Sequence, residues 1–570
     1  MKNKLPLFLL IGLLTASLSA CDSFFDYFKS PSTRRGGRGS SSSSSSVIEE
    51  SSSSDLSSSN STSGSEEIIT PEPGDLTANK ATRTYADFVS NNVYDISATP
   101  ADGDAKILII PIWFSDSSTY IDTSKKANVR SDIEKAYFGT NEETGWRSVK
   151  TYYEEESQGA LTLTGTVSDW YTESRSSSTF GTETTGHENT NSLVKTVADW
   201  YFNNNPSENR TDYDKDDDGY LDGVMLIYAA PDYGASNRSQ SRYGNLWAYC
   251  YWLQKTTYQN KTNPGPNAYF WASYDFMYGK EVYASRTGMS NKQYLGGDTS
   301  HANIDAHCFI HEMGHMFGLE DYYDYSKQYS PAGGFSMQDS NVAGHDPFSI
   351  FALGWGSAYI PTETTTINLK PLTSSGEMII LTPSWNTYNS AFDEYIIIEY
   401  YTADGLNSLD STYEYQKGSR YPTGSKTAGI RLWHVDARLL YTNQIDSYGE
   451  PVYSSSKVTT NPLISEGGVA LMMSNTYSGG NADDYVTPLG NSYADYNILQ
   501  MIRNNKSATH KNSKNMVASD LFKTGDTFSM SDYASQFKNR GKLNSSKNLN
   551  FSFEVNGLTS EFASITVTKL

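Results

Sequence analysis

Two histidines and a glutamate lie close together in the stretch HEMGHMFGLEDYYD, which begins at His311. His311 and His315 are four residues apart, slightly more than one helical turn, so on a helix both imidazoles project from the same face and can bind one metal ion. Zinc accepts such a pair, with nitrogen ligands at about 2.0–2.1 Å in a tetrahedral arrangement. Glu312 follows the first histidine and can accept a proton from a zinc-bound water without coordinating the metal itself. The spacing therefore predicts a hydrolytic zinc site with Glu312 as the general base.

The residues after the second histidine supply a turn and a third ligand. Gly318 lies three residues beyond His315, where a left-handed glycine can end the helix and reverse the chain. Asp321 lies three residues further on and is the predicted third ligand, which leaves the fourth position for water. Glu320 and Asp324 are within one turn of Asp321, so both stay open as alternatives.

Helices and strands interleave around this motif, from about residue 85 to residue 360. Apolar runs predict strands at 106–114, 160–167 and 223–230, and Pro111 implies that the first of these is an edge strand or is bulged. Helices are expected over 129–138 and over 149–157, the second with Ser148 as its N-cap. A further helix is expected near residue 197, with an apolar face formed by Leu193, Val194, Val197 and Tyr201.

Beyond Pro361 the helical signal nearly vanishes. Strand-like runs such as EYIIIEYY, GIRLWHVD and FASITVTKL alternate with Gly, Asn, Ser and Asp clusters. Residues 361–570 are therefore expected to form a mostly antiparallel, sandwich-like β region, packed on or continuous with the domain at 85–360. The fold class expected for the whole chain is α+β.

The first residues predict export and anchoring. A basic start with Lys2 and Lys4 precedes an apolar run, and the tetrapeptide Leu-Ser-Ala-Cys then ends at Cys21. This pattern is similar to a bacterial lipoprotein signal over 1–20, cut before Cys21, whose lipid then binds the chain to a membrane. The alternative is an ordinary signal peptide cut near Ala20. Residues 21–84, which are rich in serine, are expected to form a disordered, flexible stalk.

A second metal site is predicted in the acidic stretch DKDDDGYLD, which begins at Asp214. It matches the first part of an EF-hand calcium loop, with a glycine at the sharp turn. The twelfth position is Met225 instead of the usual glutamate, and an apolar strand run follows in place of a helix. We expect a structural calcium site here, with oxygen ligands from Asp214, Asp216, Asp218, the Tyr220 carbonyl and Asp222.

Charge and cysteine content narrow the class of protein. The net charge of −21 argues against a nucleic-acid partner, which requires a basic face. Three cysteines are too few for a disulfide-stapled scaffold of this length, so ordinary hydrophobic cores must hold the fold. Cys250 and Cys308 either pair with each other or remain buried thiols, and the sequence does not rank these alternatives.

The motif H-E-x-x-H-x-x-G-x-x-D resembles the metzincin pattern with aspartate in place of the usual third histidine. More narrowly, it resembles the immune inhibitor A family of secreted bacterial metallopeptidases. Further stretches that look like family blocks occur in the family's order, namely SVKTYYEEESQGALTLTGTV, DYDKDDDGYLDGVMLIYA, GGFSMQDSNVAGHDPFSIFALGW and GIRLWHVD. The resemblance implies a metzincin-like zinc peptidase domain, endopeptidase activity on proteins or peptides, and a methionine turn beneath the metal at Met337.

Two features depart from that pattern. Some metzincins place a tyrosine two residues after the turn methionine, whereas Asp339 occupies this position here, so the oxyanion donor is unassigned among Tyr322, Tyr323, His345 and His434. Family members also commonly carry a long prosegment. Here either a short piece within 83–101 keeps the enzyme latent or the enzyme is exported active.

The predicted function is that of a lipid-anchored zinc endopeptidase acting outside the cytoplasm. The alternative from another class is a non-catalytic surface protein with a vestigial metal site, whose 42 tyrosines help to capture a partner. A third possibility is a zinc hydrolase that acts on non-peptide bonds. It would use the same site, but it would not account for the stretches that resemble the peptidase family.

Overall fold

The computed structural model describes part of the chain. The described residues are 74–90, 99–182, 187–232, 246–253, 258–290, 304–324, 329–340, 342–413, 415, 422–444, 457–463, 469–471, 475 and 496–570. The predicted signal segment, Cys21 and residues 22–73 of the predicted stalk lie outside them. The end of that stretch, 74–84, is not a free stalk, since Gly74 donates its N–H to Thr366 and Asn79 pairs with Ala358. Within the described ranges, no helix combines the length and the apolar character that crossing a bilayer requires.

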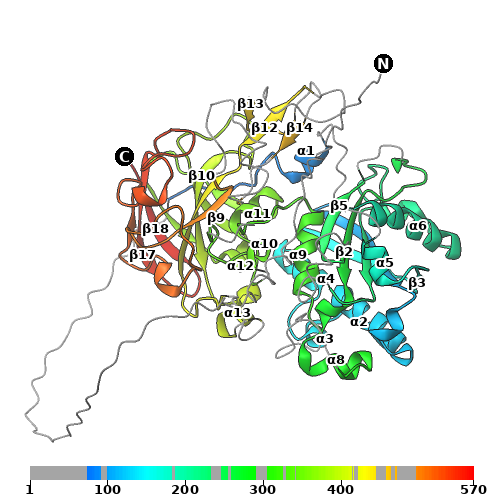
Figure 1. Cartoon of the computed structure of the whole chain (residues 1–570). Helices are drawn as coiled ribbons and strands as arrows, with labels where there is room; N and C mark the ends of the chain where they lie inside the picture. Colours follow the sequence, from blue (N-terminus) through cyan, green and yellow to red (C-terminus); the bar gives the residue numbers. More distant parts are fainter. Residues whose placement is uncertain are drawn as a thin grey trace, which may run out of the picture.

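The first half of the described chain is built on a six-stranded sheet with the strand order β2-β1-β4-β6-β5, in which β3 also pairs with β1 (Figure 1). All of its pairings are parallel except that of β5, which lies antiparallel to β6 at one edge. The strands are β1 (Gly103–Trp113), β2 (Leu161–Val167), β3 (Tyr171–Thr172), β4 (Val224–Tyr228), β5 (Tyr249–Trp252) and β6 (Ala268–Ser273). The three strands predicted at 106–114, 160–167 and 223–230 correspond to β1, β2 and β4.

Pro111 does not lie in an edge strand, so that part of the prediction is wrong. It sits within β1, which has partners on both sides. Ile109 and Trp113 accept backbone hydrogen bonds on the β2 and β3 side, so the nitrogen of Pro111 faces that side as well. The pairing with β2 ends at Ile109 and the pairing with β3 begins at Ile112. The missing N–H therefore falls in the gap between two partner strands, where it costs no ladder hydrogen bond.

Helices cover both faces of this sheet because successive side chains of β1 point in opposite directions. Ile107 and Ile109 belong to the core formed with α2, α4 and α9, whereas Leu108 and Ile110 belong to the core formed with α6. The helices of this half are α1 (Tyr85–Ser90), α2 (Lys126–Phe138), α3 (Asn141–Thr144), α4 (Val149–Glu156), α5 (Ser177–Thr182), α6 (Glu188–Asn204), α8 (Lys280–Thr287) and α9 (His307–Met316).

Local sequence signals account for the helices that were predicted. Ser148 caps α4, since its hydroxyl accepts a hydrogen bond from the Thr151 N–H at 3.2 Å. Gly159, with φ of 76°, follows the helix end in the left-handed region. On α6, the predicted apolar face is buried, and it comprises Leu193, Val194, Val197 and Tyr201.

The second half of the described chain is dominated by strands. A five-stranded sheet has the order β15-β11-β10-β9-β7, and a four-stranded sheet has the order β16-β17-β18-β8. Their pairings are antiparallel apart from β7 with β9. The strands are β7 (Ser357–Tyr359), β8 (Thr365–Leu369), β9 (Glu377–Leu381), β10 (Glu394–Tyr401), β11 (Gly429–Asp436), β15 (Leu499–Ile502), β16 (Thr527–Phe528), β17 (Phe551–Leu558) and β18 (Ala563–Lys569).

Smaller elements complete this half. A three-stranded antiparallel sheet consists of β12 (Leu439–Thr442), β13 (Lys457–Thr459) and β14 (Val469–Leu471). Four short helices, α10 (Met337–Ser340), α11 (Pro347–Ala352), α12 (Leu372–Ser375) and α13 (Ser408–Thr412), lie between the two halves in Figure 1.

One hydrophobic core crosses residue 360, where the sequence suggested a domain boundary. Ile380 and Ile397 of the five-stranded sheet belong to the same buried cluster as Phe309 of α9 and Phe348 of α11. The opposite face of that sheet shares a separate core with the four-stranded sheet, which includes Ile396 and Ile565. The β region is thus packed continuously against the half that carries the histidine motif.

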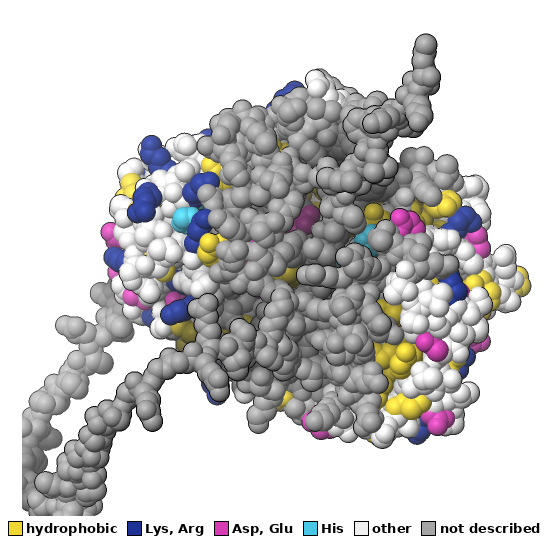
Figure 2. Space-filling model, in the orientation of Figure 1, with side chains coloured by type: hydrophobic (Ala, Val, Ile, Leu, Met, Phe, Trp, Pro, Cys, Tyr) yellow, Lys and Arg dark blue, Asp and Glu magenta, His cyan; other side chains and the backbone are white. Residues whose placement is uncertain are grey.

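The surface charge is uneven on the face shown in Figure 2. Lys and Arg side chains gather over the part where Figure 1 places β17 and β18, although the net charge of the chain is −21.

Candidate metal centre

Helix α9 carries both histidines of the motif, and all ten of its residues are buried. Its apolar side chains, which include Phe309, Ile310 and Met313, belong to the core beneath the sheet. Burial of this apolar side leaves His311 and His315 together on another side of the helix, with ring centroids 4.9 Å apart. The four-residue spacing therefore places both imidazoles on one side of the helix, as the sequence predicted.

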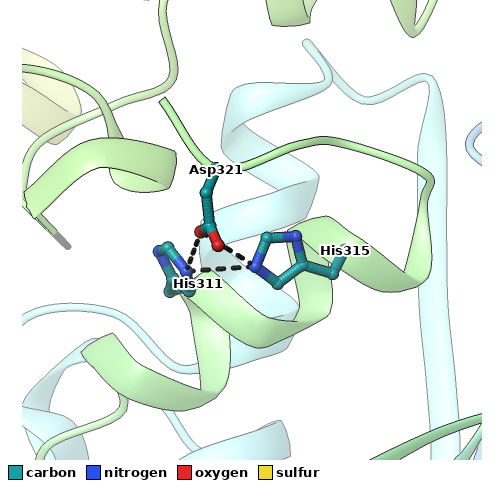
Figure 3. A group of neighbouring side chains, drawn as sticks. All are labelled: His311, His315 and Asp321. Atoms are coloured by element: carbon teal, nitrogen blue, oxygen red, sulfur yellow. Dashed lines mark hydrogen bonds and ion pairs between the residues drawn. The ribbon is translucent and has the colours of Figure 1, made fainter. Parts of the chain in front are cut away.

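A glycine-based turn ends α9 and returns the chain toward the histidines. Gly318 has φ of 100° and donates its N–H to the carbonyl of His315, while Leu319 donates to the carbonyl of Gly314. This pair of hydrogen bonds is the Schellman arrangement, which reverses the chain at a helix C-terminus. Asp321 follows directly and is thereby brought over the two imidazoles (Figure 3).

Three ligand atoms converge at this point. His311 Nε2 lies 3.2 Å from His315 Nε2, and each of these atoms lies 3.2 Å from Asp321 Oδ1. A tetrahedral zinc ion with bonds of about 2.0–2.1 Å separates its ligands by about 3.3 Å. The observed triangle has the size that such an ion requires. Among the described residues, these three side chains form one group that could hold a metal ion, and Glu320 and Asp324 are not part of it.

Backbone carbonyls fix the orientation of both rings. His311 Nδ1 lies 2.6 Å from the carbonyl oxygen of Met337, and His315 Nδ1 lies 2.8 Å from that of Leu319. A carbonyl only accepts hydrogen bonds, so each Nδ1 carries a proton, and a ring without a second proton presents an Nε2 lone pair. Two lone pairs and a carboxylate oxygen then face one another in a buried space. Only a cation satisfies all three, and this donor set fits zinc.

A proton is the competitor of a metal ion at this position. For the side chains alone, burial lowers the pKa of His315, but the Asp321 carboxylate outweighs this effect and raises that pKa to about 10. Burial likewise raises the pKa of Asp321, yet the two imidazoles, His315 foremost, hold it well below its usual range. Metal binding must displace the proton on His315, so it releases a proton to solvent.

Glu312 lies on α9 between the two histidines and is fully buried. Its charge contributes to the raised pKa of His315, which is consistent with a position beside the metal ligands. Its backbone carbonyl accepts a hydrogen bond from the Cys250 thiol at 2.9 Å, which connects α9 to strand β5.

Met337 is buried at the start of α10, directly beneath His311. The contact with His311 is made by its backbone carbonyl, which the sequence did not predict. Gln338 is a second residue that sequence reasoning missed. A Cβ atom on Gly314 would lie 2.2 Å from Gln338 Oε1, so the glycine inside the H-E-x-x-H motif allows α10 to approach α9 closely. Gly314 was the feature of the sequence that could have indicated this close approach between the two helices.

The four candidate oxyanion donors lie in different surroundings. Tyr323 donates its hydroxyl to Asp321 Oδ2 at 2.9 Å, so it directly contacts a predicted ligand. Tyr322 contacts Ser349 at 2.8 Å, and His434 pairs with Glu394 within the β region. The remaining candidate, His345, packs against Tyr152, Tyr153 and Trp355, and burial lowers its pKa to about 3.

The two cysteines that the structure describes are both buried thiols. The disulfide that the sequence left open between Cys250 and Cys308 is therefore not formed. Burial raises the pKa of the Cys250 thiol well above its ordinary value, so it acts as a neutral donor to α9.

The acidic loop brings together part of its predicted calcium ligand set. Carboxylate oxygens of Asp214, Asp216 and Asp218 lie within 4.8 Å of one another. Asp222 lies outside this group, and its two oxygens accept the N–H groups of Lys106 at 2.7 Å and Lys215 at 2.8 Å. The role of the Tyr220 carbonyl as a calcium ligand stays a prediction.

Comparison with known proteins agrees with this site. The family model described as "Immune inhibitor A peptidase M6, catalytic domain" matches residues 101–344, which contain both histidines, Glu312, Asp321 and Met337. Two curated relatives, both named pre-pro-metalloprotease PrtV and taken from two strains of Vibrio cholerae serotype O1, are 28% identical over 218 residues. The alignment covers 35% of this chain and 21% of each relative, so the chain spans about a fifth of their length.

Proposed function

We propose that this chain, whose residues 101–344 match the family model of the immune inhibitor A peptidase catalytic domain, is an exported zinc endopeptidase that hydrolyses peptide bonds in proteins. One observation carries the proposal. Two imidazole lone pairs and a carboxylate oxygen lie 3.2 Å apart, and a glutamate of the H-E-x-x-H motif belongs to the same helix. His311, His315 and Asp321 are the proposed ligands, and Glu312 is the proposed general base.

We interpret the domain at 85–360 as metzincin-like and the region at 361–570 as sandwich-like. The first interpretation is supported by the mixed sheet with one antiparallel edge strand, by the helix that carries both histidines, and by the buried Met337 beneath them. The second is supported by the core shared between the five-stranded and the four-stranded sheet.

The protein side chains account for the proton transfers of the reaction. When bound, a zinc ion polarises the scissile carbonyl and lowers the pKa of water toward about 7. Glu312 accepts the proton of the attacking water and later donates it to the departing amine. Because the water attacks directly, no covalent bond forms between the chain and its substrate. Tyr323 holds Asp321 Oδ2, which leaves Oδ1 directed at the two histidines.

A cleavage assay tests this function. We expect the purified protein to digest casein, and we expect a zinc chelator and the substitution Glu312→Gln each to abolish digestion. Glu312→Gln keeps the size of the side chain and removes only its basicity, so this variant should retain zinc. If the wild-type protein contains zinc and cleaves no protein substrate, the non-catalytic binding protein becomes the better interpretation.

Metal analysis tests the ligand set separately. We expect about one zinc per chain in the wild-type protein and a large loss in Asp321→Ala, since three protein ligands are the minimum of a catalytic zinc site. Asp324→Ala is the matched control, because Asp324 lies outside the group of three but in the same short segment. Equal zinc content in both variants would remove Asp321 from the ligand set.

We extend the proposal to a structural calcium ion at Asp214, Asp216 and Asp218. Burial and the neighbouring Asp214 raise the pKa of Asp216, because both disfavour its negative charge. A bound cation would relieve the repulsion between these carboxylates. Calcium should therefore raise the melting temperature of the wild-type protein and have little effect on Asp216→Asn. Asp217→Asn is the control, since Asp217 is exposed and pairs with Lys261. A calcium response retained in Asp216→Asn would contradict this site.

The proposed location is the outer side of a bacterial membrane, with the chain anchored through lipid on Cys21. The support comes from the sequence pattern at 1–21. Wild-type protein expressed in a bacterium should fractionate with membranes, whereas Cys21→Ser should be released or remain uncleaved. Identical fractionation of both proteins would leave only an ordinary signal peptide.

A further inference from the structure

The segment that carries Met337 is held between the two halves of the molecule. It comprises residues 329–340 and 342–345, and we name it the Met337 segment. On its first side, the β region binds the backbone: Met501 donates its N–H to the carbonyl of Pro331 at 2.9 Å, and Met516 donates to that of Gly333 at 2.8 Å. Residues far along the chain therefore fix the entrance to the turn beneath His311.

On its other side, the segment is held by a buried carboxylate. Asp410, on helix α13, accepts the N–H of Ala343 at 2.7 Å through Oδ2 and is fully buried. Ala343 has φ of 62°, a left-handed conformation that costs a non-glycine residue free energy and persists only where its surroundings impose it. The short hydrogen bond to a carboxylate is of the stronger, charge-assisted kind, so it can impose this backbone conformation.

A short chain of hydrogen bonds connects Asp410 to the predicted metal ligand. Asp410 holds Ala343, and the next residue, Gly344, accepts the N–H of Met337 at 3.3 Å through its carbonyl. The carbonyl of Met337 in turn accepts the proton on His311 Nδ1 at 2.6 Å. Each group in this chain contacts the next, so a displacement of Ala343 moves the acceptor that orients the His311 ring.

We propose that Asp410 is a positioning residue of the metal centre, acting through the Met337 segment on His311. This inference rests on the proposed zinc site. Asp410 lies beyond residues 101–344, so the β region contributes to the metal centre although it lies outside the match to the catalytic-domain family. The metal-binding unit therefore extends across residue 360, as the hydrophobic core does.

The test measures zinc affinity by competition with a chelator of known affinity, together with the visible absorption spectrum of the cobalt-substituted protein. Partners that orient a ligating histidine typically change metal affinity by about 10–100-fold. We expect Asp410→Ala to weaken zinc binding by about 10-fold and to change the cobalt spectrum. Asp410→Asn should restore both, because its amide oxygen can accept the Ala343 N–H.

A control variant separates positioning from stability. Ser411→Ala removes a buried hydroxyl that donates to the Ser408 carbonyl within the same helix, at 2.9 Å, without contact to the Met337 segment. It should lower the melting temperature slightly and leave zinc affinity unchanged. If Asp410→Ala does not fold, Asp410→Ser replaces it and should also bind zinc more weakly than Asp410→Asn does.

The outcomes distinguish this inference from the proposed function. A wild-type protein that binds no zinc would overturn the zinc site itself. A wild-type protein that binds zinc, with a folded Asp410→Ala or Asp410→Ser variant of the same affinity and the same cobalt spectrum, would overturn only the role of Asp410.

Discussion

His311 Nδ1 lies 2.6 Å from the carbonyl oxygen of Met337, a residue 26 positions further along the chain. This contact fixes both the rotation and the tautomer of the imidazole, so Nε2 is presented as a lone pair toward His315 and Asp321. This hydrogen bond therefore joins the turn to the helix that carries the proposed zinc ligands.

Tyr323→Phe is expected to weaken zinc binding by about 10-fold, because it removes the hydroxyl that donates to Asp321 Oδ2 and frees the carboxylate to rotate. Chelator competition measures the effect. The adjacent Tyr322→Phe is the control, since its hydroxyl contacts Ser349 instead. If both variants lose zinc affinity equally, general destabilisation and not the contact with Asp321 is responsible.

Gly314→Ala is expected to destabilise the protein by about 1–3 kcal/mol, the usual effect of forcing an extra methyl group into a packed core. The new Cβ atom would lie 2.2 Å from Gln338 Oε1, so α9 and α10 must separate. Denaturant unfolding measures the loss. Combining the change with Gln338→Ala should recover much of it, and a purely additive double variant would show that the two residues do not collide.

The contribution of Glu156 to the free energy of unfolding is expected to fall as the pH rises from about 5 to 8. Burial, aided by nearby carboxylates, raises the pKa of Glu156 to about 8, from about 4.3 in an unfolded chain. An acid whose folded-state pKa is raised stabilises the fold fully below its unfolded pKa and loses that contribution as the pH rises through the folded pKa. At about 1.4 kcal/mol for each pH unit, the ionisable Glu156 lowers the free energy of unfolding by up to about 4 kcal/mol over this pH range.

Unfolding of Glu156→Gln at several pH values measures this linkage. The variant cannot ionise, while its amide oxygen can still accept the N–H of His345 as Glu156 does. Its stability should depend less on pH than that of the wild-type protein. Asp222, whose pKa burial also raises to about 8, keeps part of the pH dependence in both proteins. Identical pH profiles would mean that Glu156 is not protonated in the fold at neutral pH.

Zinc is expected to raise the melting temperature of the metal-depleted protein, since it neutralises three buried acceptors that face one another only in the folded state. A free zinc concentration 100 times the dissociation constant adds about 2.7 kcal/mol of stability. Differential scanning calorimetry measures the shift. His315→Ala should respond far less, and an undiminished response in that variant would place the stabilising zinc elsewhere.

Several features of the site could be predicted because their causes are local. The spacing of His311 and His315 places both rings on one side of a helix, and Gly318 marks the turn that returns Asp321 to them. The same holds for the cap at Ser148 and the apolar face of α6. Each of these depends on helical periodicity or on the conformation of a single residue, which neighbouring sequence determines.

Other predictions failed or were incomplete because distant partners decide them. Pro111 suggested an edge, but the gap between β2 and β3 accommodates it inside the sheet. Asp222 fits the spacing of a calcium loop and stays a prediction as a ligand, while its carboxylate also accepts the N–H group of Lys106 in β1. For both residues a strand distant in the sequence makes a contact that the neighbouring sequence does not reveal.

The sequence by itself determined which atoms could bind a metal ion and which carboxylate could move a proton, since these depend on side-chain chemistry and on one turn of helix. Only the tertiary structure decided how those atoms are aimed. The carbonyl of Met337 and the amide of Gln338 reach α9 from a segment more than 20 residues away, and the carboxylate of Asp410 holds Ala343 from still further along the chain. Hydrogen bonds act between groups that touch, whatever their separation along the chain.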